Sequence, residues 1–154
     1  MQQFLIRSAG PEDGGELAGM RHSLWPEETL ERHTEDLAPL LAGKPRGNLP
    51  AVVFVAQGHD GSLIGFIEVS LRSHADGCDP SHPVGFIEGW YVKPVFRGRQ
   101  IGPNLLLAAE RWAREAGCHE MASDTWVDNL HSQRVHEALG FEVVDRCVHY
   151  RKRL

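Results

Sequence analysis

The sequence predicts an α/β protein built on a mixed central sheet. Short apolar runs rich in β-branched residues alternate with segments of helical period, and in mid-chain a long strand feeds a glycine-containing turn and a helix. The composition, 42% hydrophobic and 24% charged, is that of an ordinary globular protein. A chain of 154 residues has room for one core, so we expect residues 1–154 to form a single domain with one active site.

The first third of the chain is predicted to form a strand at residues 4–6 and two helices. The first helix carries apolar residues at helical spacing, namely Leu17, Met20 and Leu24. It ends at Trp25, because the residue before a proline is pushed out of the α region. Thr29 is suited to cap the second helix, which runs to about Leu41. The inner face of that helix is expected to contain Leu30, His33, Leu37 and Leu40.

The rest of the chain is predicted to complete the sheet. Residues 51–56 and 63–71 read as the two arms of a hairpin, and residues 84–92 resume the sheet after a polar loop at 73–83. The later elements are expected to be a helix at 103–116, a strand at 120–123, a helix at 130–139 and a final strand at 141–150.

Charge and cysteine usage restrict the partners and the compartment. The formal net charge of -5 opposes non-specific binding to nucleic acid, which requires a positive surface. No segment approaches membrane-spanning length, the start shows no export signal, and the three cysteines lack paired C-x-x-C spacing. We therefore expect a cytoplasmic protein with free thiols and with neither a membrane nor a nucleic-acid partner.

The segment 90–103 joins a strand end, a basic loop and a helix start. A helix N-terminus has four backbone N–H groups without internal partners and carries partial positive charge, so such a layout binds phosphates. Gly98 and Gly102 permit close backbone approach, while Arg97 and Arg99 add positive charge. The spacing fits neither a Walker loop nor the dinucleotide fingerprint. The alternative is an ordinary strand–helix connection with solvated arginines.

This segment resembles the acetyl-CoA signature of the GNAT acetyltransferases, Arg/Gln-x-x-Gly-x-Gly/Ala after the fourth strand. The matching residues are Val92, Pro94, Arg97, Gly98, Ile101 and Gly102, whereas Gln100 stands where the signature usually has its first glycine. The resemblance implies a GNAT-like central sheet, splayed and flanked by helices on both faces, with acetyl-CoA as co-substrate and no metal. The implied acetyl-CoA contacts here are Trp90, Tyr91, Val92, Arg97, Gly98, Arg99, Gln100, Ile101, Gly102 and Pro103.

A second GNAT-like element lies downstream, in Asn129, Ser132, His136 and the pair Gly140-Phe141. The resemblance implies that Asn129 contacts CoA, and a helix cap is the alternative role. His136 occupies a position where the family often has a tyrosine near the sulfur. A histidine could protonate a departing thiolate at neutral pH, or it could be structural.

Residues 84–92 carry a carboxylate among aromatic residues. Period 2 predicts Phe86, Glu88 and Trp90 on one face of this strand, and Ile87, Gly89 and Tyr91 on the other. Glu88 requires a cation, a donor or an open cleft, because burying an unpaired carboxylate is costly. An internal arginine is the structural alternative. Gly89 predicts a bulge or a close approach, and in GNAT proteins such a bulge splays the strands and exposes backbone N–H groups near Tyr91 and Val92.

Nearly the whole chain is similar to the aminoglycoside 6′-N-acetyltransferases of this superfamily. The matching segments are residues 24–26, 77–79, 83–92, 121–125 and 150–153. The resemblance implies transfer of acetyl to the 6′-amine of an aminoglycoside, antibiotic resistance and a homodimer. The implied substrate contacts are Trp25, His74, Asp79, Glu88, Asp124 and Asp145, with His74 in a loop where relatives carry a tyrosine.

The chemistry requires a base, because a 6′-ammonium must lose a proton before it attacks the thioester. Glu88 and Asp124 are both candidates, and His136 is the candidate acid. Other readings remain open: a GNAT enzyme for a polyamine, an arylalkylamine or a protein N-terminus, a non-catalytic CoA-binding module, and a metal site formed by His74, Cys78 and His82.

Overall fold

The computed structural model describes residues 3–154, so the first two residues of the predicted domain lie outside the described part. The elements in chain order are β1 (Phe4–Ser8), η1 (Pro11–Asp13), α1 (Gly14–Leu24), α2 (Leu30–Leu41), β2 (Ala51–Gly58), β3 (Leu63–Arg72), β4 (Val84–Val92), η2 (Pro94–Phe96), α3 (Ile101–Glu115), β5 (Glu120–Ser123) and α4 (Leu130–Ala138).

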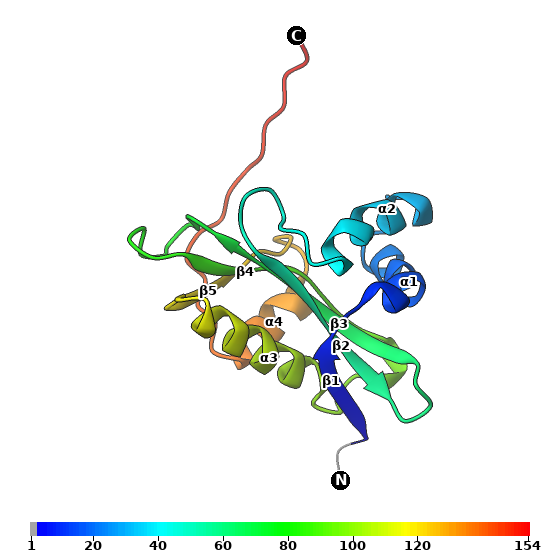
Figure 1. The fold of residues 1–154 in the computed structure, drawn as a ribbon. Helices are drawn as coiled ribbons and strands as arrows, with labels where there is room; N and C mark the ends of the chain where they lie inside the picture. The colour runs from blue at the N-terminus through cyan, green and yellow to red at the C-terminus, as the bar shows by residue number, and fades with distance from the viewer. Residues whose placement is uncertain (1–2) are drawn as a thin grey trace.

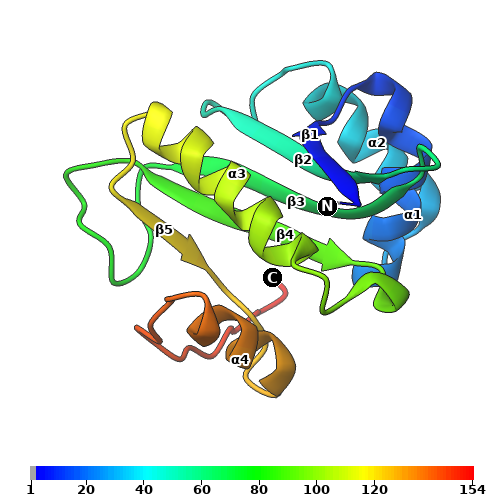
Figure 2. The same ribbon diagram turned by 90° about the horizontal axis from the view of Figure 1, so that it is seen from below.

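The sheet has the strand order β1-β2-β3-β4-β5 and is mixed, as predicted. Strands β1 to β4 are successively antiparallel, whereas β5 runs parallel to β4. Helices α1 and α2 cover one face of the sheet, and α3 and α4 lie on the other (Figures 1 and 2). The predicted arrangement with helices on both faces is therefore confirmed.

Strand β3 lies at the centre of the core and is buried on both faces. Phe66 packs with Leu17 and Leu37 under α1 and α2, whereas its neighbour Ile67 packs with Leu105 under α3. Alternate side chains of β3 thus pack into two apolar layers, one on each face of the sheet. This is why the run 63–71 is almost continuously apolar.

The helix boundaries follow local chemistry. The Thr29 hydroxyl accepts a hydrogen bond from the Arg32 N–H at 3.2 Å, and Trp25 closes α1, so both predicted boundaries are confirmed. The prediction that Leu30 lies on the inner face is wrong: its side chain is 47% exposed, because at the first helical position it precedes the turn that packs on the sheet. Helix α3 starts at Ile101, two residues before the predicted 103.

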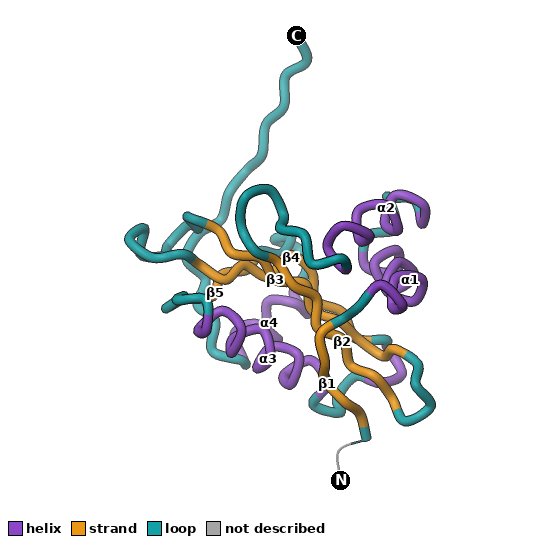
Figure 3. The backbone as a smooth tube through the Cα atoms, viewed as in Figure 1, coloured by secondary structure: helices purple, strands orange, loops and turns teal. Residues whose placement is uncertain are grey.

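The predicted final strand at 141–150 is wrong. Residues 141–154 form no strand, and exposed side chains such as Val148 and Tyr150 lie along them. Figure 3 shows this C-terminal tail as a loop that leaves the body of the molecule. An extended segment becomes a strand only when its backbone groups bond to a neighbouring strand, and within this chain the tail runs away from the sheet.

Candidate active site

The site begins where β4 and β5 part. The parallel pairing extends only from Val84↔Glu120 to Ile87↔Ser123, while β4 continues to Val92. On its other side, β4 pairs with β3 through Glu68↔Gly89 and Val69↔Ile87, so Glu88 is an extra, bulged residue. The predicted bulge and splay are therefore confirmed, and Glu88 stands at the point where they begin.

The bulge inverts the alternation of side chains along β4. Ile87 and Trp90 both pack in the α3 layer, whereas Tyr91 packs with the α1 and α2 layer. The predicted face of Phe86, Glu88 and Trp90 is therefore wrong for Trp90, and the predicted face of Ile87, Gly89 and Tyr91 is wrong for Gly89 and Tyr91. Because Glu88 is an extra residue, each later side chain of β4 lies on the opposite face from the one that strict alternation predicts.

Glu88 has several partners within the chain. The Ser70 hydroxyl donates to Glu88 Oε1 at 2.5 Å, and Arg72 Nη2 lies 3.0 and 2.9 Å from the two carboxylate oxygens. The Arg72 guanidinium also lies 3.4 Å over the ring of Phe86. The internal arginine considered from the sequence is thus present. Since 44% of the Arg72 side chain is exposed, the Glu88 carboxylate lies near solvent.

Trp25 packs directly on the bulge. A Cβ built on Gly89 would lie 2.6 Å from Trp25 Cη2 and 3.1 Å from Cζ2, so only glycine leaves room for this ring. The close approach predicted at Gly89 is therefore confirmed, and its partner is Trp25. The packing brings Trp25 and Glu88, two predicted substrate contacts, to the same part of the sheet.

Beside Glu88 lies a buried ion cluster that the sequence analysis missed. Glu68 on β3 is fully buried and pairs with Arg46 of the α2–β2 loop and with Arg21 of α1, whose Nε lies 3.4 Å from Glu68 Oε2. Arg21 also stacks on Trp25, with its guanidinium carbon 5.2 Å from the ring centre. The sequence does contain a signal for this cluster, because Glu68 is a single carboxylate within an apolar strand, just as Glu88 is.

The parting of β4 and β5 leaves backbone groups facing the gap. The Lys93 N–H donates a hydrogen bond to Ile64 O on β3 at 2.9 Å. Because the backbone groups of successive residues in a strand point to opposite sides, the N–H and C=O of Val92 point away from β3. The Val92 carbonyl accepts a hydrogen bond from Arg97 Nε at 2.9 Å, and the Val92 N–H points into the same gap. This donor is placed to polarise a carbonyl group bound between the strands.

The loop from Arg97 to the start of α3 has the backbone shape of an anion site. Gly98 and Gln100 both have positive φ, 75° and 65°, and this wraps the chain around the α3 N-terminus. Ile101 and Gly102 are the first helical residues, so their N–H groups have no partner inside the helix. Pro103, at the third position, needs no such partner either. These residues fit a pyrophosphate.

Gln100 is the one non-glycine residue with positive φ in residues 3–154, and it stands where the family signature usually has a glycine. We expect Gln100→Gly to be more stable than Gln100→Ala by about 1 kcal/mol, because only glycine adopts this conformation without a steric penalty. Thermal unfolding should then separate the two variants by about 2–4 °C at this chain length. Equal midpoints would contradict the assignment of strain to this position.

His136 lies on the α3 side of the split. Its Nε2 lies 2.8 Å from Ser123 Oγ, its Nδ1 lies 2.7 Å from Ser132 O, and its ring meets that of Trp90 edge-on at 5.6 Å. The Ser123 contact was not predicted. Asn129 accepts from Ser132 N–H at 3.1 Å, so it caps α4 as its alternative role required.

The other predicted substrate residues lie further out. Asp124 directly follows Ser123, which is level with Ile87, so Asp124 stands across the split from Glu88. His74 and Asp79 lie in the exposed 73–83 loop, where hydrogen bonds from Ser81 to Asp79 hold the pKa of that carboxyl below its usual range. Asp145 is exposed on the tail, and no hydrogen bond or ion pair in the described chain joins these three residues to Glu88.

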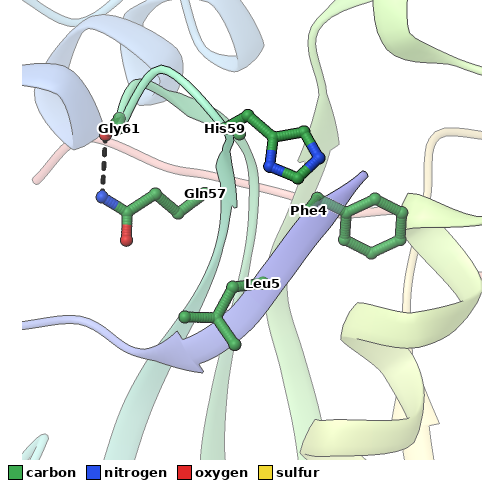
Figure 4. Close-up of a pocket in the computed structure, with 6 residues that line it drawn as sticks. Phe4, Leu5, Gln57, His59 and Gly61 are labelled. Carbon is green, nitrogen blue, oxygen red and sulfur yellow. Dashed lines mark hydrogen bonds between the residues drawn. The ribbon is translucent and has the colours of Figure 1, made fainter. Parts of the chain in front are cut away.

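Two cavities lie beside the β2–β3 turn, at the end of the sheet where β4 leads into the loop before α3. One of about 330 Å³ opens beside β1 and the β2–β3 turn, where Gln57 Nε2 donates to Gly61 O at 2.9 Å (Figure 4). It is lined by Phe4, Leu5, Gln57, Gly58, His59 and Gly61 and holds no carboxylate. The other, of about 770 Å³, adjoins the α3 N-terminus through Arg99, Gln100, Ile101 and Asn104.

Within residues 3–154 no three His, Cys, Asp or Glu side chains are grouped so as to hold a metal ion, and the proposed grouping of His74, Cys78 and His82 is not formed. Across the same residues, no helix combines the length and apolar character needed to span a membrane.

Comparisons with known proteins agree with this geometry. The acetyltransferase (GNAT) family matches residues 17–141. An aminoglycoside N(6′)-acetyltransferase type 1 from Stenotrophomonas maltophilia is 40% identical over 95% of this chain and 91% of its own length, and one from Salmonella typhimurium is 43% identical over 88% and 89%.

Solved structures give the same result. AAC(6′)-Iy in complex with the bisubstrate analog CoA-S-monomethyl-acetylneamine superposes with a TM-score of 0.87 at 39% identity, over 98% of this chain and 99% of that one. AAC(6′)-Ih from Acinetobacter baumannii reaches 0.87 at 28% identity, over 98% and 99%. With a matching family signature, fold and split sheet, the chain belongs to the acetyltransferase (GNAT) family, in its aminoglycoside N(6′)-acetyltransferase group.

Proposed function

We propose that this chain transfers the acetyl group of acetyl-CoA to the 6′-amine of aminoglycosides and thereby confers resistance to them. The observation that carries the proposal is that one strand, β4, presents both halves of the site. Glu88 stands where β4 leaves β5, and the anion-binding loop follows the other end of the same strand. Relatives of similar length and fold act on this class of drug, as their names state.

Acetyl-CoA supplies the acetyl group on a thioester. The backbone N–H groups at the start of α3 would hold its pyrophosphate, with Arg97 and Arg99 adding charge. The Val92 N–H would hold the thioester carbonyl oxygen. Trp90, Tyr91 and Asn129 complete the set of proposed contacts along the split.

Glu88 or Asp124 would take the proton that the 6′-ammonium loses, directly or through a water. The free amine then forms the new N–C bond as the C–S bond breaks, and its nitrogen releases a second proton to water as it becomes an amide. The departing sulfur needs a proton, and His136, held by Ser123, is the proposed donor. Trp25, His74, Asp79 and Asp145 are proposed to contact the rest of the polycationic substrate, which suits the net charge of -5.

An assay of the purified protein against an amine panel tests this function. We expect acetyl-CoA turnover with aminoglycosides bearing a 6′-amine and none with matched drugs bearing a 6′-hydroxyl. In a susceptible host, expression should raise the inhibitory concentration of the first set only. Turnover restricted to spermidine, an arylalkylamine or peptide N-termini would favour the other GNAT activities. CoA binding without transfer to any amine would favour a non-catalytic module.

We also propose that the protein is a homodimer in which the tail, residues 141–154, packs on a second copy. Eight of the twelve large hydrophobic side chains exposed in the described chain follow residue 125: Trp126, Val127, Leu130, Val143, Val144, Val148, Tyr150 and Leu154. Strand β5 pairs on one side only, and α4 buries no residue. A second copy would cover these apolar groups and supply the strand partner that the tail lacks.

Light scattering with size exclusion tests the dimer. We expect the wild type at twice the chain mass of 17.2 kDa and Val148→Asp at the chain mass itself. Val95→Asp is a matched control, because both valines are 73% exposed but Val95 lies far from the tail in sequence, in η2. A wild-type monomer, or a Val148→Asp variant that stays dimeric, would contradict the proposal.

We further propose a cytoplasmic location without a membrane or nucleic-acid partner. All three cysteines, Cys78, Cys118 and Cys147, are free thiols in the structure, as is expected of a protein in a reducing compartment. Burial raises the pKa of Cys118, as it does that of Cys78, which keeps both thiols protonated.

A further inference from the structure

The split between β4 and β5 is the candidate substrate cleft, and the two carboxylates beside it, Glu88 and Glu68, are each held by an arginine of the chain itself. On β3, Glu68, Ser70 and Arg72 are two residues apart, so they share the face of the sheet that also receives Glu88. Arg72 binds Glu88, and Arg46 binds Glu68 from the loop that joins α2 to β2, which arches beside the sheet in Figure 1.

The inner and outer members of this cluster differ in exposure. The side chains of Glu68 and Arg21 are 1% and 8% exposed, so packing fixes them. Those of Arg46 and Arg72 are 43% and 44% exposed, so each guanidinium can leave toward water. Arg46 lies between Gly43 and Gly47, both of positive φ, and a β-bridge to Leu49 holds its backbone, so only its side chain has to move. Packing and Arg21 therefore still hold Glu68 when Arg46 leaves, and the Ser70 hydroxyl still holds Glu88 when Arg72 leaves.

The positive charges of Arg46 and Arg72 oppose the binding of a polycation at this place. With both in place, three guanidinium groups face two carboxylates, and the nearby net charge is positive. With both displaced, Arg21 faces Glu68 and Glu88, and the net charge is negative. Burial lowers the pKa of Arg46, and the charge of Glu88 raises it in part, so this cation loses hydration where it sits.

We propose that Arg46 and Arg72 are internal counter-ions that occupy the ammonium positions of the cleft, and that the aminoglycoside displaces them when it binds. Glu68 is then a second ammonium subsite beside Glu88. The two arginines lower the affinity for the drug while they keep the carboxylates paired in its absence. This inference rests on the proposed role of Glu88 in binding the substrate.

Steady-state kinetics at saturating acetyl-CoA, with an aminoglycoside bearing a 6′-amine, tests the displacement. We expect Arg72→Met to lower KM for the drug about two- to fivefold with little change in kcat, since a half-exposed ion pair no longer competes. Arg72→Lys should restore most of the wild-type KM. The KM difference should shrink at high salt, because the competing charges are then screened.

Arg114→Met is the matched control, because it removes the same charge from an exposed ion pair with Glu110 on α3, outside the cleft. We expect its KM to equal that of the wild type. Arg46→Met should also lower KM, and calorimetric titration of the drug in the presence of CoA gives a second readout for both variants. If Arg46→Met melts far below the wild type, Arg72→Met alone decides the result.

An unchanged or raised KM in Arg72→Met would overturn the inference, because Arg72 would then orient Glu88 rather than compete with the drug. A fall in KM equal to that of Arg114→Met would also overturn it, since net charge alone would explain the change. These outcomes differ from failure of the proposed function, in which the wild type itself acetylates no 6′-amine drug.

Discussion

Replacing Glu88 with glutamine is expected to lower kcat for aminoglycoside acetylation by about 100- to 10,000-fold, the range typical of losing a general base. The glutamine keeps the size of the side chain and an oxygen that can accept from Ser70, but it cannot take a proton from the substrate. The lost ion pair with half-exposed Arg72 should cost less than about 1 kcal/mol of folding stability. Initial rates and thermal unfolding, measured together, separate the two effects.

Asp124→Asn is the informative companion, because Asp124 faces Glu88 across the split and is the other candidate base. Glu115→Gln, an exposed carboxylate at the end of α3, controls for the change of net charge. If Asp124→Asn loses the large factor while Glu88→Gln retains kcat within about tenfold, the base is Asp124 and Glu88 serves only in binding.

Gly89→Ala is expected to lower the free energy of unfolding by about 1–3 kcal/mol, as overpacking does in other cores. The new methyl would meet Trp25 Cη2 at 2.6 Å and Phe66 Cε2 at 3.4 Å, so the Trp25 ring must move away from the bulge. Because Trp25 is a proposed substrate contact, KM for the drug should rise as well. Thermal unfolding and kinetics of the same preparation measure both effects.

Gly19→Ala is the matched control, since it makes the same chemical change inside α1, where nothing lies within 4 Å of the added atom. It should raise stability by about 0.5–1 kcal/mol, because alanine loses less conformational freedom in a helix. Trp25→Phe, which removes the two clashing ring atoms, should reduce the cost of Gly89→Ala in a double-mutant cycle. Equal costs with and without Trp25→Phe would show that the ring is not the obstacle.

Much of the fold could be predicted because its signals are local. The bounds of β4 and β5 follow from short apolar runs set between turn-forming residues, and the Thr29 cap follows from one hydroxyl before a helix. The loop before α3 has its own local signature in glycines and arginines next to a helix start. Elements of this kind depend on few distant residues.

The predictions that failed depend on longer-range structure. The face of Trp90 depends on a register shift against β3, which the sequence of β4 does not contain. The final strand at 141–150 has strand-like residues, but within the described chain the tail runs away from the sheet and bonds to neither of its free edges. The pairing of Arg21 and Arg46 with Glu68 joins residues 47 and 22 positions apart, so its partners could not be named even though the buried carboxylate could be noticed.

The short pairing between β4 and β5 also bears on how the protein opens. Only four residue pairs hold β5 to the sheet, none of its side chains is fully buried, and α4 buries none either. Strand β3, by contrast, bonds on both sides and is buried along nearly its whole length. Local unfolding should therefore begin in β5 and α4, with amide protons there exchanging long before those of β3. Ser123, Asp124 and His136 lie on this β5–α4 side of the split. We therefore expect this side of the site to open when product leaves.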